Sequence, residues 1–108
     1  MADINVTQVT RSGVTLPDQI TSTGADLTLP SNDGNVIVEV ENPTGGSLTV
    51  TFVTTATVGG QALADLSVSI SSGATRWIGP LPPALYNDAF GAVTVQAASG
   101  LKLRALRI

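Results

Sequence analysis

The chain has 108 residues, with five Lys and Arg against eight Asp and Glu, for a formal net charge of −3. This length is that of one domain, and it suffices to bury about two thirds of the surface that the unfolded chain exposes. The sequence contains no Cys and no His. Disulfide scaffolds, thiolate or imidazole metal sites, and catalysis by either group are therefore excluded. The excess of acids argues against general binding of nucleic acid.

The residue types indicate β-structure. Thr occurs 14 times and Val 12 times, and both have branched, stiff side chains that are favoured on a pleated surface. Eleven Gly and six Pro are spread along the chain and leave few unbroken stretches long enough for a helix. Since there are only four aromatic residues, the core is expected to consist mainly of Val, Leu, Ile and Ala.

Alternating apolar and polar residues mark the strands. The first starts at residue 4 and ends at the turn 11–13, and residues 14–23 are expected to form a loop or an edge segment because Pro17 breaks the pattern. The clearest strand is 36–41, where Val36, Val38 and Val40 share one face. In chain order the further predicted strands are 26–29, 47–55, 66–70, 75–79, 93–97 and 101–108, with a loop at 57–64 and a long connection at 80–91.

About eight short antiparallel strands separated by turn residues predict an all-β fold, a single β-sandwich over residues 1–108. The jelly roll is one candidate arrangement, and the pattern does not give the strand order. Residues 1–12 either pack on their own sandwich, which is the preferred interpretation, or act as an arm that contacts a neighbouring subunit.

The chain shows no export or membrane signal. Its first residues carry Asp3 where a signal peptide has basic residues, and no stretch approaches the roughly 20 apolar residues that span a bilayer. We therefore expect synthesis in a cytoplasmic compartment, and no membrane partner.

A pair of carboxylates is the enzymatic option that remains. Glu39 and Glu41 share a strand face about 7 Å apart, a spacing that acid–base catalysis can use. Acids that alternate with valines are more typical of a solvated outer face, so the sequence predicts no enzyme. Asp33, Asp65 and Asp88 stand in turn-like contexts, where side-chain oxygens bond to nearby backbone, and their spacing does not match a regular calcium loop. No cofactor or metal is expected.

Positive charge gathers at the C-terminus. Residues 1–100 hold all eight acids with Arg11 and Arg76, a balance of −6, whereas residues 101–108 hold Lys102, Arg104 and Arg107, a balance of +3. Lys102 and Arg104 share a face, but Arg107 falls on the apolar side, so we expect the strand to end or bulge near residue 106. Two interpretations stay open: a surface that docks on an acidic protein, or a charged edge strand that prevents aggregation.

The aromatic residues are the other binding candidates. Trp77 is the only Trp. It is either half-buried, in the core or in an interface, or exposed as a platform on which a sugar stacks. Tyr86 and Phe90 fall in the long connection and are candidates for a lid over the end of the sandwich.

Three segments resemble a known family. They are residues 76–88 (RWIGPLPPALYND) followed by 91–95 (GAVTV), the opening 6–13 (VTQVTRSG) and the closing 103–108 (LRALRI). The sequence is similar to small head proteins of tailed bacteriophages, which are encoded beside the major capsid protein. The likeness covers nearly the whole chain, and the IGP…PP…YND segment is its most particular element.

The resemblance implies a structural virion protein that decorates the outer surface of the expanded capsid and stabilises it by binding the major capsid protein. It also implies a homotrimer, made in the bacterial cytoplasm and located on the virion. Two alternatives remain: a β-sandwich module that binds carbohydrate or a cell surface, and another phage structural protein at the head–tail connector or tail. The family brings no catalytic residue. From charge and expected exposure, the partner-binding candidates are Arg11, Arg76, Trp77, Tyr86, Lys102, Arg104 and Arg107.

Overall fold

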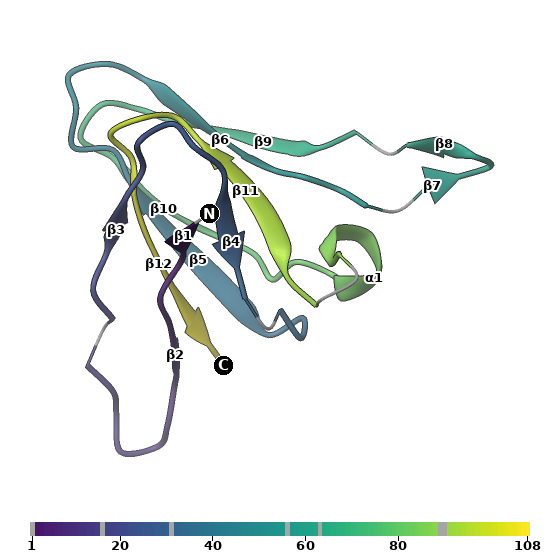
Figure 1. Cartoon of the computed structure of the whole chain (residues 1–108). Coiled ribbons are helices and arrows are strands. Elements are labelled where there is room, and N and C mark those ends of the chain that lie inside the picture. Colours follow the sequence, from purple (N-terminus) through teal and green to yellow (C-terminus); the bar gives the residue numbers. More distant parts are fainter. Residues whose placement is uncertain (1, 16, 31, 56, 63, 89–90) are drawn as a thin grey trace.

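The computed structural model describes residues 2–15, 17–30, 32–55, 57–62, 64–88 and 91–108. Figure 1 shows strands that form two packed layers, with one short helix beside them. In chain order the described strands are β1 (Ala2–Asp3), β2 (Val6–Gln8), β3 (Ile20–Thr21), β4 (Leu27–Leu29), β5 (Val36–Glu41), β6 (Leu48–Phe52), β7 (Thr57–Val58), β8 (Gln61–Ala62), β9 (Leu66–Ile70), β10 (Thr75–Ile78), β11 (Val93–Ala97) and β12 (Lys102–Arg107). The helix α1 (Pro83–Tyr86) lies between β10 and β11.

Two sheets contain most of these strands. Sheet A has the order β1-β4-β11-β6-β9, and sheet B has the order β10-β5-β12-β2, with β3 also paired to β12. Within the described ranges, β7 and β8 pair only with each other. The predicted all-β sandwich is confirmed, although β1–β4 and β12–β2 are parallel pairs rather than antiparallel ones.

The core follows from the alternation of side chains along each strand. Val36, Val38 and Val40 of β5 are fully buried, as are Val50 and Phe52 of β6 in the facing sheet. One continuous cluster joins both sheets, so the described residues share a single hydrophobic core.

The pairing of strands is nested along the chain. β6 pairs with β9, β5 with β10, β4 with β11, and β3 with β12, all antiparallel. Successive pairs alternate between sheet A and sheet B. The chain from β3 to β12 is therefore one long hairpin wrapped around the core.

The N-terminal segment joins both layers. Ala2–Asp3 adds to sheet A beside β4, Ile4 is buried in the core, and Val6–Gln8 adds to sheet B beside β12. Residues 2–8 thus pack on their own sandwich. Residues 10–15 then leave it as part of a loop that extends away from the sheets (Figure 1).

Besides β1, which precedes the predicted start of the first strand, three elements were absent from the prediction. β3 falls in the segment expected to be a loop or edge, and the β7–β8 hairpin turns at Gly59 and Gly60, both with positive φ. The third is α1, where Pro83 occupies the first helical turn, a position that tolerates proline because its N–H would have no partner. No helix in the described part of the chain has the length and apolarity needed to cross a membrane.

Candidate functional site

The outer face of sheet B brings together three of the candidate residues. Because Val38 and Val40 of β5 point into the core, Glu39 and Glu41 belong to the opposite face. In the ladder, Glu39 lies between Trp77 of β10 and Arg104 of β12. Glu41 lies between Thr75 and Lys102. We call the set Thr75, Trp77, Glu39, Glu41, Lys102 and Arg104 the Trp77 face.

A two-pronged ion pair forms the centre of the Trp77 face. Nε of Arg104 donates to Oε1 of Glu39 at 3.0 Å, and Nη2 donates to Oε2 at 3.3 Å. This fork-to-fork geometry is the strong form of a charged hydrogen bond. Glu39 is only 5% exposed, so the interpretation of both acids as a solvated face is wrong for Glu39: its cross-strand neighbours cover it.

Gln19 also covers the acids. Its Nε2 donates to Oε1 of Glu39 at 3.2 Å and to Oε1 of Glu41 at 3.0 Å. Since β12 lies between β5 and β3 in the sheet, the Gln19 side chain reaches over β12 to these carboxylates. Both acids are thus held by neutral or cationic donors of the same chain. Sequence reasoning missed Gln19, because it sits in an irregular segment whose pattern carries no signal.

Trp77 projects from the edge of this face. It is 51% exposed, because β10 is the outermost strand of sheet B and has a neighbour on one side only. The ring is therefore not part of the core, which leaves the interface and the stacking platform as interpretations. An indole fixed on a strand offers a rigid apolar surface with one N–H donor, a type of group that is enriched in binding sites.

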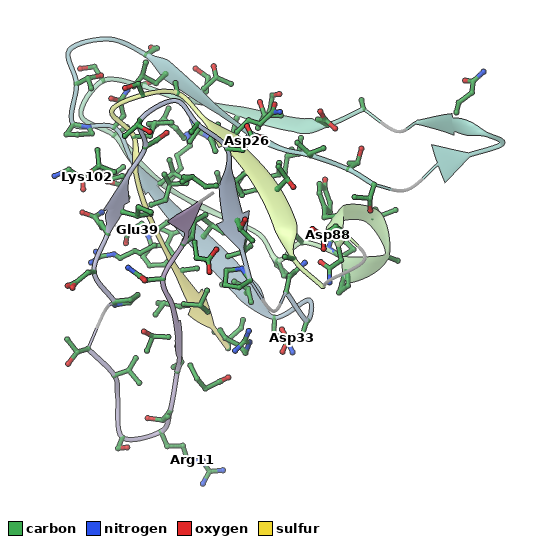
Figure 2. All side chains as sticks on the ribbon, viewed as in Figure 1. Arg11, Asp26, Asp33, Glu39, Asp88 and Lys102 are labelled. Carbon is green, nitrogen blue, oxygen red and sulfur yellow. The ribbon has the colours of Figure 1, made fainter. Side chains whose placement is uncertain are left out.

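The cations of β12 do not protect an edge. β12 is an interior strand with β5 on one side and β2 and β3 on the other, so the charged-edge interpretation is wrong. Arg104 is paired with Glu39, and Lys102 stands opposite Glu41 and Thr21. Figure 2 shows Lys102 at the periphery of the sheet.

The predicted strand end near residue 106 is confirmed, since β12 ends at Arg107, and no bulge interrupts its pairing with β5. The β5–β12 register continues without interruption to Arg107 opposite Val36. Arg107 falls on the face of β12 that carries the buried residues, but it lies beyond the core. Its Nε is 3.3 Å from Oδ2 of Asp33 in the β4–β5 turn. An arginine at this position therefore needs no break in the strand.

Arg11, Arg76 and Tyr86 lie apart from this centre. Arg11 is at the tip of the β2–β3 loop, where the Gly13 amide donates to the Thr10 carbonyl at 3.1 Å (Figure 2). Arg76 is exposed on β10 next to Trp77, but it belongs to the other face of the strand, because successive residues of a strand alternate between faces. Tyr86 of α1 is partly buried against the core. Phe90 lies outside the described residues, so Tyr86 is the one of the two predicted lid residues that the structure places.

Residues of the β10–β11 connection have packing roles. Asn87 and Asn32 exchange side-chain contacts: Nδ2 of Asn32 donates to Oδ1 of Asn87 at 2.7 Å, and Nδ2 of Asn87 donates to the Asn32 carbonyl at 2.7 Å. Nδ2 of Asn32 also donates to the carbonyl of buried Leu81. Together these contacts fasten the β10–β11 connection to the β4–β5 turn.

Asp33 and Asp88 act as the sequence predicts, whereas Asp65 bonds to a backbone amide 11 positions away in the chain. Carboxylate oxygens of Asp33, Asp65 and Asp88 accept hydrogen bonds from the backbone amides of Asn35, Thr54 and Ala92. In the part of the chain that is described, no three acids gather in a group suited to a metal ion, and no pocket is found.

Comparison of the chain with models of protein families, with curated proteins and with solved structures gives no match.

Proposed function

We propose that this chain is a structural protein that binds the outer surface of a bacteriophage capsid through the Trp77 face. The observation that carries the proposal is a half-exposed Trp on a rigid strand, with Lys102 on the same face and Arg76 next to it. Trp and Arg are enriched at the centres of protein interfaces. The sequence resemblance supplies the class of partner, the major capsid protein.

Charge supports a protein partner with acidic groups. Among the described residues, Arg11, Arg76 and Lys102 make no ion pair within 4 Å, whereas Arg104 and Arg107 do. Two of these three cations, Arg76 and Lys102, lie on β10 and β12, on either side of β5. We therefore expect Lys102, which lies on the Trp77 face, to meet acids of the partner, rather than Arg104, which is paired with Glu39.

We further infer that the sandwich is a jelly roll. The support is the nested pairing described above, with orders β10-β5-β12-β3 and β4-β11-β6-β9 in the two layers. A long hairpin wrapped so that its pairs alternate between two sheets is the arrangement of two Greek keys.

The test is co-sedimentation of the purified protein with capsids that lack it. We expect Trp77→Ala to weaken binding at least about tenfold, because a central Trp dominates the energetics of an interface. Gln96→Ala is the matched control, since Gln96 is exposed on sheet A, and it should bind like the wild type. Equal binding by Trp77→Ala would contradict the role of this face, and no binding by the wild type would contradict the function.

A second candidate function is carbohydrate or cell-surface binding, which the exposed Trp77 ring also favours. Stacking of a sugar on an indole would make the same substitution abolish binding to a glycan array. Glycan binding that is lost in Trp77→Ala, together with no capsid binding, would select this alternative. A head–tail connector or tail protein would differ in copy number per particle.

A further inference from the structure

The edge of sheet A at β9 has an open backbone. β9 pairs with β6 on one side, and no strand of the described part of the chain pairs with its other side. Since strand residues direct their N–H and C=O groups alternately to the two sides, about half of these groups face away from β6. Such an edge is a template for pairing with another strand.

β9 carries none of the devices that protect such edges. Residues 66–70 read Leu-Ser-Val-Ser-Ile, with no charge, no proline and no glycine. By contrast, β1 at the other edge of sheet A has two residues and includes Asp3, and β10 at the edge of sheet B includes Arg76. Short strands and charges are the usual protection of an edge, and among the described edge strands β9 combines five residues with neither.

The sequence of β9 is symmetric about Val68. In an antiparallel pair centred there, Val68 meets its own copy, Leu66 meets Ile70, and Ser67 meets Ser69. We propose that β9 pairs with β9 of a second copy of this chain around a two-fold axis, which joins the two A sheets into one. A two-fold contact requires a self-complementary surface, and this strand provides one.

The register follows from burial. Ile70 is buried and Leu66 and Val68 are half-buried, whereas Ser67 and Ser69 are exposed. Residues that face each other across two strands lie on the same face, so only registers that match apolar with apolar residues keep the core side continuous. Of these registers, only the one centred on Val68 pairs all five residues of β9. It also places Asp65 opposite Ser71, so it opposes no like charges.

The pairing stays within one layer. β10 is the corresponding edge of sheet B, and it carries Arg76, a charge of the kind that protects an edge from pairing. The proposed contact gives a dimer, whereas the family resemblance implies a trimer. It does not depend on the proposed function, because it concerns the purified chain in solution.

The test is the mass of the protein measured by light scattering at about 100 µM, a concentration suited to a small interface. We expect about 22 kDa, twice the 11.0 kDa chain. The double variant Ser67→Lys/Ser69→Lys places like charges opposite each other twice per dimer and should weaken association about tenfold or more. The matched variant Ser67→Lys/Ser69→Glu places Lys opposite Glu and should keep the dimer.

Circular dichroism and the melting temperature establish that both variants fold. The two variants are matched in this respect, because both lose the same contact of Ser67 with Thr51. A wild-type mass near 11 or 33 kDa would overturn the proposal. So would a dimer that tolerates Ser67→Lys/Ser69→Lys, or one that Ser67→Lys/Ser69→Glu fails to keep.

Discussion

Asn42 lies where β5 ends, and its side chain is completely buried. Its Nδ2 donates to the carbonyls of Gly46 and Ile70, and its Oδ1 accepts from the amide and the hydroxyl of Thr44. One amide thus connects the end of β5, the turn before β6 and the end of β9. A buried polar group is stable in this position because each of its hydrogen-bonding atoms has a partner.

Asn42→Ala should lower the free energy of unfolding by about 2–4 kcal/mol, because it leaves the buried Ile70 carbonyl, together with the Gly46 carbonyl and the Thr44 amide, without a partner. Asn35→Ala is the matched control at an exposed position and should change stability by less than about 0.5 kcal/mol. Urea unfolding followed by Trp77 fluorescence measures both. Equal midpoints for the two variants would show that the buried network is not stabilising.

Gly79 is required by its surroundings. It has a φ of +127°, and a Cβ at this position would lie 2.9 Å from the Val36 carbonyl oxygen. We expect Gly79→Ala to destabilise the fold by about 2 kcal/mol or more through backbone strain and overlap. Gly45→Ala, which meets nothing within 4 Å, should be nearly neutral. Thermal unfolding with no difference between the two would contradict this explanation of the IGP segment.

At the scale of elements, β5 and β12 are held together by an ion pair as well as by their ladder. We expect a double-mutant cycle of Glu39→Gln and Arg104→Met to give a coupling of about 1–2 kcal/mol, because Glu39 is buried and the contact is two-pronged. The control cycle uses Asp33→Asn and Arg107→Met, where the Asp33 side chain is 51% exposed. It should give less than about 0.5 kcal/mol. Similar couplings would contradict the ranking by burial.

The strands were predictable where one face is buried. Period-two alternation gave β5, β9 and β11 with the bounds that the structure shows. Alternation shows which residues share a face of a strand, but it does not show whether other side chains cover that face. It could not reveal that Gln19 and Arg104 enclose Glu39, because those contacts join residues 20 and 65 positions apart.

Short elements held by long-range contacts escaped prediction for a related reason. β3 has two residues and exists through its pairing with β12. The β7–β8 hairpin did carry a local signal, since Gly-Gly between two β-forming residues favours a two-residue turn. Of the candidate site, the sequence indicated Trp77, Lys102 and Arg104. It placed Lys102 and Arg104 on one face but could not add Trp77, whose proximity to them depends on strand order.

At the scale of the whole molecule, the two sheets offer different surfaces. Sheet B presents the Trp77 face, with its exposed indole and paired acids, and sheet A ends in the uncharged edge β9. The two proposals assign capsid binding to the first surface and pairing with a second copy to the other. Many weak contacts of this kind add up on a shell, because each bound copy raises the local concentration of the next.

The proposed function makes this chain a component of a capsid surface. Quantitative mass spectrometry of purified, DNA-filled particles, from a phage genome that encodes the chain, tests it most directly. We expect a copy number comparable with that of the major capsid protein, and loss of the chain from particles when Trp77→Ala replaces the wild type. Absence of the wild-type chain from filled heads, or a copy number that fits only one ring at the tail, would contradict the claim.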